Sequence, residues 1–358
     1  FFITSMTGGG AERVMALLTN ELVKRGHDVT IITMLKGESF YELDKRITLL
    51  SFGREHQIPS LKKIISKFKW MLFIRKYIKK GEPDIVISFV EGFNASVVLA
   101  TRFLDIPVVS SEHTTFDEKM SLSRKIQRLQ INKWADKVTI LTQQDSDFLG
   151  DRLNNKVVMP NPLSYSPIER IGKRDNIVLA VGNVGRYFIK GFDNLLKIWR
   201  NVAPKYPDWR LQIAGDGNTE SFEYLALLAK ENGVTESVDF LGPLKDIKTK
   251  YRESAIFILS SRYEGFGMVL IEAMSQGCAC VSYDCTSGPG EIITNNVDGI
   301  LVPDQDMQRM EESLYCLMND ETMRLRFGEG AIKSLDRFSL TKIVDRWEDL
   351  FRDVKAQR

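Results

Sequence analysis

Two glutamates eight positions apart are the side chains in this sequence best placed to do chemistry. Glu264 comes just before a Gly-Phe-Gly turn, and Glu272 lies in the apolar stretch Met268–Gln276, which has the length of a short helix. Because a helix rises about 1.5 Å per residue, Glu272 would lie roughly 6 Å inside it, while Glu264 stays ahead of its first turn. A buried carboxylate needs a polar partner, and the hydroxyls of a sugar or a ribose are suitable partners. The amides at the helix start would face an anion.

A glycine-rich turn near the amino end offers a second place for a phosphate. Thr7–Gly10 contains three consecutive glycines and precedes an amphipathic stretch, Ala11–Arg25. Glycine lets the backbone pass close to a ligand, and a helix start offers unpaired N–H groups. The spacing is not the G-x-G-x-x-G of dinucleotide-binding proteins, which disfavours a dehydrogenase. Alone, the turn could be purely structural and the two glutamates solvated surface acids. The combination of acids and glycine-rich loops favours a ligand site.

The segments that would position these loops alternate between a strand-like and a helix-like pattern of apolar residues. Short runs rich in β-branched residues have the composition of strands covered on both faces, and amphipathic stretches of helical length separate them. The alternation indicates parallel sheets with helices on both faces, where ligands bind beyond the carboxyl ends of the strands. A stiff stretch with three prolines, residues 160–167, places a domain boundary near 165–175. The strand candidates are residues 29–32, 85–89, 108–110, 138–141, 177–181, 209–214, 238–241, 255–259 and 280–283.

Composition is typical of a globular protein with a substantial core. The chain has 358 residues, 43% of them hydrophobic and 27% charged, and about two domains are expected at ~150 residues each. No apolar run approaches the ~18 residues of a membrane-spanning helix, and no leader segment opens the chain. The first residues read as a strand already under way, so we expect the natural chain to begin earlier. Four cysteines in this length indicate a reducing, cytoplasmic compartment.

Charge is unevenly distributed along the chain. The net charge of +2 gives no reason to expect a nucleic-acid partner. Residues 1–168 hold 24 basic and 18 acidic residues, whereas residues 169–358 hold 25 and 29. Any anionic surface should therefore meet the first half of the chain.

Short motifs recur along nearly the whole sequence. They are Gly9–Arg13, Ala214–Gly217, Phe240–Gly242, Glu264–Ala273, Ser287–Ile293 and Asp298–Pro303. Together they resemble the motifs of the retaining glycosyltransferases of family 4. The resemblance implies an α/β GT-B fold, with two Rossmann-like, doubly wound domains that face each other across a cleft. Residues 1–168 would form the acceptor-side domain, residues 169–338 the nucleotide-sugar-binding domain, and residues 339–358 a helix that crosses back to the first domain.

The resemblance implies catalytic roles for four side chains. Glu264 should contact hydroxyls of the donor sugar, and His113 should reach the sugar that reacts. Lys190 matches the phosphate-binding lysine of the family, and Arg186 should be its basic companion. Four positions separate Arg186 from Lys190, one fewer than is usual in the family. Taken without the resemblance, His113 reads as an ordinary core or loop histidine.

The resemblance also implies a set of nucleotide-sugar contacts. Glu272 should hold the ribose, and the backbone at the helix start should lie against the donor and its phosphates. The expected binding set is Gly9, Gly10, Asn183, Leu244, Gly267, Met268, Val269 and Glu272.

These roles imply a retaining glycosyltransferase that moves a sugar from a nucleotide sugar, with UDP the favoured carrier, to a glycan or lipid-linked glycan in bacterial surface polysaccharide assembly. The nucleotide sugar is a substrate, so no cofactor is expected. No metal is expected either, because fixed cations and helix amides can stabilise the leaving diphosphate. The triplets Asp145–Asp147 and Asp304–Asp306 are interpreted as chance matches to a metal-binding Asp-x-Asp. Two alternatives stay open: another sugar-nucleotide enzyme of this fold, such as an epimerase, and a non-catalytic subunit that binds nucleotide sugars.

Residues 62–80 form a candidate membrane contact. The segment contains eight basic residues and no acidic one, and Ile65, Phe68 and Leu72 share one helical face. Basic amphipathic helices bind anionic lipid surfaces or phosphate-bearing chains. We therefore predict a peripheral association with the inner face of the plasma membrane, with a lipid-pyrophosphate-linked acceptor as a partner. The alternative is an ordinary outer helix with a solvated basic rim.

Overall fold

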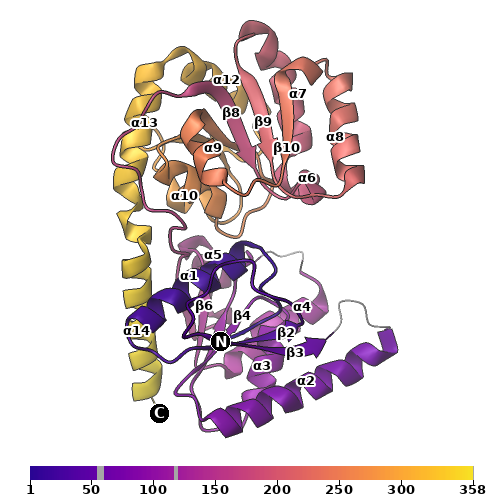
Figure 1. The fold of residues 1–358 in the computed structure, drawn as a ribbon, viewed down its shortest axis with the longest axis vertical. Coiled ribbons are helices and arrows are strands. Elements are labelled where there is room, and N and C mark those ends of the chain that lie inside the picture. Colours follow the sequence, from indigo (N-terminus) through magenta and orange to yellow (C-terminus); the bar gives the residue numbers. More distant parts are fainter. Residues whose placement is uncertain (55–59, 117–119, 358) are drawn as a thin grey trace. The chain divides into compact units, whose positions relative to one another are not determined.

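The chain folds into two compact units, each with one parallel sheet between helices (Figure 1). The structure is a computed structural model that describes residues 1–54, 60–116 and 120–357, with the backbone alone described for residues 54 and 60–67. Its contacts separate Phe1–Ser164 together with Phe338–Arg358 from Tyr165–Arg337.

The first unit is built on seven described strands in the order β3-β2-β1-β4-β5-β6-β7. All neighbouring pairs are parallel. The order reverses between β1 and β4, so the loops that leave these two strands diverge and open a space at their carboxyl ends. The strands are β1 (Phe2–Ile3), β2 (Thr30–Leu35), β3 (Thr48–Arg54), β4 (Val86–Phe89), β5 (Val108–Ser111), β6 (Lys137–Ile140) and β7 (Lys156–Val158).

Two helices, α2 and α3, share an apolar cluster with this sheet. Trp70 and Ile74 of α2 pack in it with Val97 of α3 and with Ile32 and Val86 of the strands. The four-residue spacing between Trp70 and Ile74 places both on one face of α2. The helices of the first unit are α1 (Gly10–Lys24), α2 (Ser60–Gly81), α3 (Asn94–Thr101), α4 (Leu122–Lys125), α5 (Gln143–Leu149) and α14 (Leu340–Ala356).

The carboxyl-terminal helix α14 belongs to the first unit, as the predicted returning helix requires. Its Trp347 is 2% exposed, and the indole stacks on the ring of Phe89 in β4 with centroids 6.1 Å apart. Arg25, just after α1, forms ion pairs with Asp345 at 2.6 Å and with Glu348 at 2.7 Å. The helix is therefore fixed by an apolar face against the unit and by a charged edge against α1.

The second unit repeats the same plan with six described strands. Their order is β10-β9-β8-β11-β12-β13, all parallel, and it reverses between β8 and β11. The strands are β8 (Asp175–Val181), β9 (Arg210–Ala214), β10 (Val238–Gly242), β11 (Ser254–Leu259), β12 (Ala279–Asp284) and β13 (Ile300–Pro303). The helices are α6 (Tyr187–Lys190), α7 (Phe192–Val202), α8 (Thr219–Glu231), α9 (Ile247–Glu253), α10 (Met268–Ser275), α11 (Pro289–Ile292), α12 (Met307–Asn319) and α13 (Glu321–Ser334).

The predicted fold class is confirmed: both sheets are parallel and doubly wound, and α14 packs on the first unit. The structure adds β3, β7 and β13, which were not among the strand candidates. All three are edge strands. Strand β3 has Ser51 and Gly53 among its apolar residues, and β7 and β13 are only three and four residues long.

Packing of α14 on the first unit predicts a large loss of stability when its central side chain is removed. Trp347→Ala should lower the free energy of unfolding by about 3–5 kcal/mol, because truncating a buried tryptophan leaves a cavity. Arg352→Ala is the matched control on the same helix. Arg352 is 71% exposed and pairs with Asp349 one turn away, so its loss should cost less than about 0.5 kcal/mol. Equal denaturation midpoints for the two variants would contradict this packing.

Candidate active site

Two loops leave neighbouring strands at the carboxyl edge of the second sheet, where the strand order reverses. Residues 182–191 follow β8, and residues 260–267 follow β11, its hydrogen-bonded neighbour. These loops carry Lys190 and Glu264. The structure therefore brings together two residues that lie 74 positions apart in the sequence.

Lys190 and Glu264 form an ion pair, with Nζ and Oε1 2.8 Å apart. The hydroxyl of Ser261 donates to the same carboxylate oxygen at 2.6 Å. Glu264 is only 8% exposed, so the ammonium and the hydroxyl compensate the cost of burying its charge. An ammonium has three N–H donors, and among the described residues only Glu264 accepts from that of Lys190, which leaves two donors for the oxygens of a ligand.

Contacts between the two loops fix the position of this pair. The Ser260 hydroxyl donates to the Lys190 carbonyl at 2.9 Å, and the Arg262 amide donates to the Ile189 carbonyl at 2.8 Å. Gly191 has φ +68°, and a Cβ there would lie 1.9 Å from the Ser260 carbonyl oxygen. Only glycine allows the loops to approach this closely.

Arg262 provides a second ion pair at the same place. Its guanidinium binds Asp193 of α7 through both terminal nitrogens, at 2.7 and 2.9 Å, and lies 4.1 Å from the ring centroid of Phe188. Two parallel hydrogen bonds between planar groups restrict the relative orientation of their backbones. The loop after β11 is thereby held to the helix that follows Lys190.

Glu272 is the fifth residue of α10 and is 3% exposed, which confirms its predicted place inside the helix. The hydroxyl of Tyr251, a buried residue of α9, donates to its Oε2 at 3.2 Å. Gly267, with φ +105°, caps the start of α10. The first amides of a helix have no partner within it, so those of Met268 and Val269 can bind an anion.

The remaining predicted residues of the second unit lie on surface loops. Asn183 and Arg186 are exposed in the turn after β8, and Leu244 is 36% exposed after β10. In the described chain, the Arg186 side chain has no hydrogen bond or ion pair. The structure therefore does not join Arg186 to the Lys190–Glu264 pair, and its role stays a prediction.

In the first unit, the predicted glycines lie at the start of α1. Gly10 is its first residue, and the backbone of Gly9 exchanges two hydrogen bonds with the Tyr41 hydroxyl, at 3.3 and 3.0 Å. A Cβ at Gly9 would come within 2.4 Å of the carboxylate of Glu12. A side chain at this position would therefore displace the acid that lies in the first turn of the helix.

His113 follows β5 at the carboxyl edge of the first sheet. Its ring stacks on Phe89 with centroids 4.6 Å apart, and its Nε2 lies 3.0 Å from the hydroxyl of Ser111. Burial lowers the pKa of His113 to about 3, so the ring is neutral at pH 7. Its other nitrogen, Nδ1, is buried and has no hydrogen-bond partner among the described residues.

A buried ion pair supports the loop that holds His113. Glu112 and Arg128 are each 1% exposed, and Nε and Oε2 are 2.9 Å apart. Arg128 also donates to the carbonyls of Thr114 at 2.7 Å and Thr115 at 2.9 Å. The backbone is thus anchored on both sides of His113, and the charge of Glu112 is compensated inside the fold.

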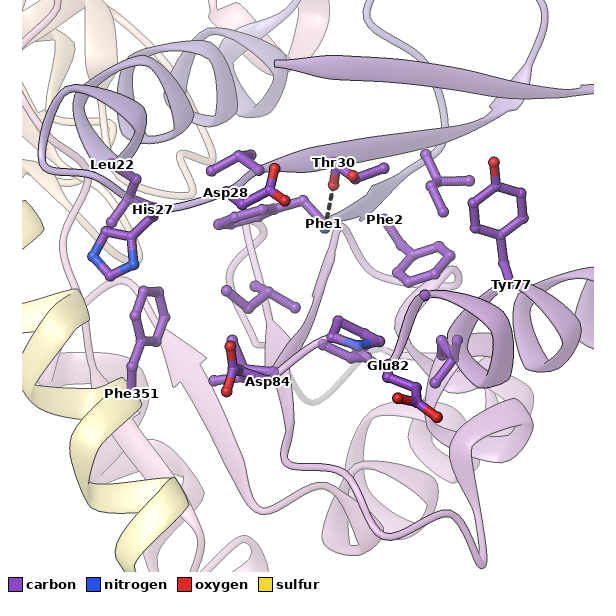
Figure 2. Close-up of a pocket in the computed structure, with 18 residues that line it drawn as sticks. Phe1, Phe2, Leu22, His27, Asp28, Thr30, Tyr77, Glu82, Asp84 and Phe351 are labelled. Atoms are coloured by element: carbon purple, nitrogen blue, oxygen red, sulfur yellow. Dashed lines mark hydrogen bonds between the residues drawn. The ribbon is translucent and has the colours of Figure 1, made fainter. Parts of the chain in front are cut away.

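A cavity of about 340 Å³ lies at the opposite edge of the first sheet (Figure 2). It is lined by Thr30 and Val86, the first residues of β2 and β4, and by side chains such as His27, Tyr77 and Phe351. The predicted site residues of this unit, Gly9, Gly10 and His113, do not line it. The cavity is therefore separate from the candidate site.

The two Asp-x-Asp triplets have structural partners. Asp145 accepts from the Phe116 amide at 3.0 Å and from the Thr115 hydroxyl at 3.1 Å. Asp306 caps α12 by accepting from the Arg309 amide at 3.0 Å. In residues 1–54, 60–116 and 120–357, no group of three acidic, histidine or cysteine side chains is arranged to hold a metal ion.

Several side chains that support the predicted site residues cannot be recognised from sequence alone. Ser261 is an exception, because it is next to the Glu264 motif and could have been found from its position. Tyr251 and Asp193 carry no local signal, because their partners Glu272 and Arg262 lie in other segments of the chain. Only the packing of the second unit brings these side chains together.

Comparison with known proteins agrees with this arrangement. Residues 8–164 match the family model described as Glycosyltransferase Family 4, and residues 164–334 match Glycosyl transferases group 1. The chain is 30% identical over 356 residues to an uncharacterized glycosyltransferase of Haemophilus influenzae, covering 98% of both chains. It is 29% identical over 364 residues to an α-1,4-N-acetyl-D-galactosaminyltransferase of Campylobacter jejuni, named for a diNAcBac-PP-undecaprenol-linked acceptor, covering 99% of this chain and 98% of that protein.

Solved structures agree at the level of the fold. A variant of TarM from S. aureus, crystallised with UDP, superimposes with a TM-score of 0.81 at 13% identity and covers 98% of both chains. The strand orders, the helix that returns to the first unit and the two matched family models lead to one conclusion. The chain belongs to the family 4 glycosyltransferases and has the GT-B fold.

Proposed function

We propose that this enzyme is a retaining, metal-independent glycosyltransferase that uses a UDP-sugar donor and a glycan or lipid-linked glycan acceptor. The observation that carries the proposal is the Lys190–Glu264 pair at the carboxyl edge of the second sheet. A lysine with unused N–H donors suits a diphosphate, and a buried carboxylate beside it suits sugar hydroxyls. The names of the relatives support the choice of substrates, since one acts on an undecaprenol-pyrophosphate-linked glycan and one structure holds UDP.

The proposed reaction breaks the bond between the anomeric carbon and the diphosphate oxygen, and the acceptor oxygen takes its place on the same face of the sugar. Negative charge grows on the departing diphosphate. Lys190 and the amides of Met268 and Val269 stabilise that charge without having to reorganise. The proton of the acceptor hydroxyl passes to an oxygen of the departing phosphate. Retention of configuration follows from the family.

Each remaining group has a role that fits its surroundings. Glu264 orients the transferred sugar through its hydroxyls, and Glu272, held by Tyr251, accepts hydrogen bonds from the ribose. His113 contacts the transferred sugar as a neutral group. Arg186, exposed and without a protein partner in the described chain, supplies a second cation for the diphosphate.

The acceptor is proposed to meet the enzyme at an anionic membrane surface, through α2. Trp70, Ile74 and Ile78 fix one face of this helix to the core, and Phe68 and Leu72 are 61% and 52% exposed. The exposed side also carries Lys69, Lys76, Lys79 and Lys80 and no acid. The side chains of Lys62, Lys63 and Ile65 lie outside the described residues. No helix of the described chain is long and apolar enough to cross a bilayer.

Replacing Lys190 should remove most of the activity while the protein stays folded. Lys190→Met should lower kcat by about 10²–10³, the usual cost of losing one group that stabilises charge in the transition state. The measurement is transfer from a panel of UDP-, GDP- and ADP-sugars, with EDTA present throughout. Lys197→Ala, an exposed lysine of α7, is the matched control and should behave as wild type. Full activity of Lys190→Met would exclude this mechanism, and donor consumption without any acceptor would favour an epimerase.

Removing the carboxylate of Glu272 should weaken nucleotide binding. Glu272→Ala should raise the Kd for UDP at least about tenfold, because hydrogen bonds to a charged acceptor contribute about 1.5–3 kcal/mol. Tyr251→Phe, which removes one hydroxyl donor to this carboxylate, should have a smaller effect in the same direction. Calorimetric titration with UDP is the measurement, and Glu231→Ala, an exposed acid at the end of α8, is the control. An unchanged Kd for Glu272→Ala would refute the ribose assignment.

The exposed face of α2 should bind anionic vesicles. Sedimentation with vesicles rich in phosphatidylglycerol should be reversed by high salt and absent with neutral lipid. Removing Lys79 and Lys80 together with Lys62 and Lys63 should weaken binding by about fivefold per lysine. Phe68→Ser with Leu72→Ser should weaken it further, whereas Leu227→Ser, an exposed leucine of α8, should not. Equal binding by the lysine variant would exclude this surface.

A further inference from the structure

A short chain of hydroxyl groups leads from the interior of the first unit to His113. Thr139 of β6 donates to the hydroxyl oxygen of Ser111 of β5, at 2.7 Å. The Ser111 oxygen lies 3.0 Å from Nε2 of His113. Thr139 and Ser111 are 2% and 1% exposed, so bulk water does not compete for these bonds. The three side chains come from adjacent strands and the loop that follows β5.

The direction of the Thr139–Ser111 hydrogen bond decides the direction of the Ser111–His113 hydrogen bond. Because Thr139 donates its proton to Ser111, the Ser111 proton is free to be donated onward, and Nε2 of His113 is the acceptor in reach. A neutral imidazole carries one proton, so an Nε2 that accepts requires the proton on Nδ1. The opposite tautomer would place two donors on the Ser111 oxygen and leave the buried Ser111 proton without an acceptor, which is costly.

We propose that Ser111, oriented by Thr139, is a positioning residue that sets His113 in its Nδ1–H tautomer and so presents a hydrogen-bond donor to an oxygen of the sugar donor. We call the three side chains Thr139, Ser111 and His113 the relay. The Nδ1 atom of His113 is buried and has no partner among the described residues, so the proton on Nδ1 still needs a hydrogen-bond acceptor. A hydroxyl or phosphate oxygen of a ligand can accept this hydrogen bond, whereas a group that only donates cannot.

Two further contacts keep the ring in the plane that this bond requires. Phe89 stacks on His113 with an interplanar angle of 24°, and Trp347 of α14 stacks on Phe89 with an interplanar angle of 19°. The Glu112–Arg128 pair anchors the neighbouring backbone. Burial also keeps the ring uncharged at neutral pH, so the tautomer, not the protonation state, decides what Nδ1 offers.

The tautomer is independent of the reaction, whereas its effect on catalysis rests on the proposed function. It can be read directly in two-bond ¹H–¹⁵N spectra of protein labelled at histidine, because protonated and bare ring nitrogens resonate far apart. The chain has three histidines, and His113→Gln identifies the relevant signals. The full chain without substrate should show a neutral His113 with the proton on Nδ1. A proton on Nε2, or a charged ring at pH 7, would overturn the proposal without any variant.

Three variants test the relay itself. Ser111→Ala should shift His113 toward the Nε2–H tautomer, and Thr139→Val, nearly equal in shape to threonine, should shift it part of the way. Thr139→Ser keeps the hydroxyl and should restore the wild-type spectrum. An unchanged tautomer in folded Ser111→Ala overturns the role of Ser111, and an unchanged tautomer in Thr139→Val removes Thr139 from the relay.

Transfer kinetics separate the relay from the proposed function. Thr139→Val should lower kcat/KM for the sugar donor by about 2- to 10-fold, the usual effect of one weakened hydrogen bond, and Thr139→Ser should restore it. If the wild-type enzyme transferred no sugar at all, the proposed function would fail while the tautomer result stood. Wild-type kinetics in a Thr139→Val variant with a shifted tautomer would overturn the catalytic part of the proposal.

Discussion

The ion pair between Lys190 and Glu264 is the interaction on which the organisation of the second unit's site depends. It joins loops that leave two neighbouring strands at the reversal of the strand order. The cation and the hydroxyl beside it stabilise a carboxylate that is only 8% exposed. The loops must therefore approach closely, which explains a glycine at position 191 and a serine at position 260. The same closeness fixes the lysine before any ligand arrives.

The two units offer different electrostatics. The second unit presents fixed charge: a lysine, two buried carboxylates and the first amides of α10. The first unit presents a neutral histidine at the end of a chain of hydroxyl groups, and the buried Glu112–Arg128 pair beside it compensates its own charges. Charge stabilises a leaving diphosphate, whereas a neutral donor can orient a sugar without attracting the phosphate. Charged groups in the second unit and a neutral hydrogen-bond donor in the first are consistent with the chemistry of glycosyl transfer.

The carboxyl-terminal helix also contributes to the packing around His113. Helix α14 buries Trp347 against Phe89, and Phe89 stacks on His113. The last helix is thus part of the packing that holds a predicted catalytic ring, in addition to stabilising the first unit. Helix α2 divides its residues in a similar way, with Trp70, Ile74 and Ile78 buried and its lysines exposed. Helix α2 therefore has one face that the core requires and another that is exposed.

The sequence by itself determined those features that depend on residues close together in the chain. Buried strands were recognisable as β-branched runs, α10 from the turn before Met268, and Glu264, Glu272 and Lys190 from their motifs. The strands β3, β7 and β13 were missed: β3 has Ser51 and Gly53 among its apolar residues, and β7 and β13 are three and four residues long. Only the tertiary structure decided which side chains meet: Tyr251 with Glu272, Asp193 with Arg262, and Thr139 with Ser111 and His113. The physical reason is that periodicity and turn chemistry act over a few residues, whereas these hydrogen bonds join separate strands and helices and exist only once the sheets have packed.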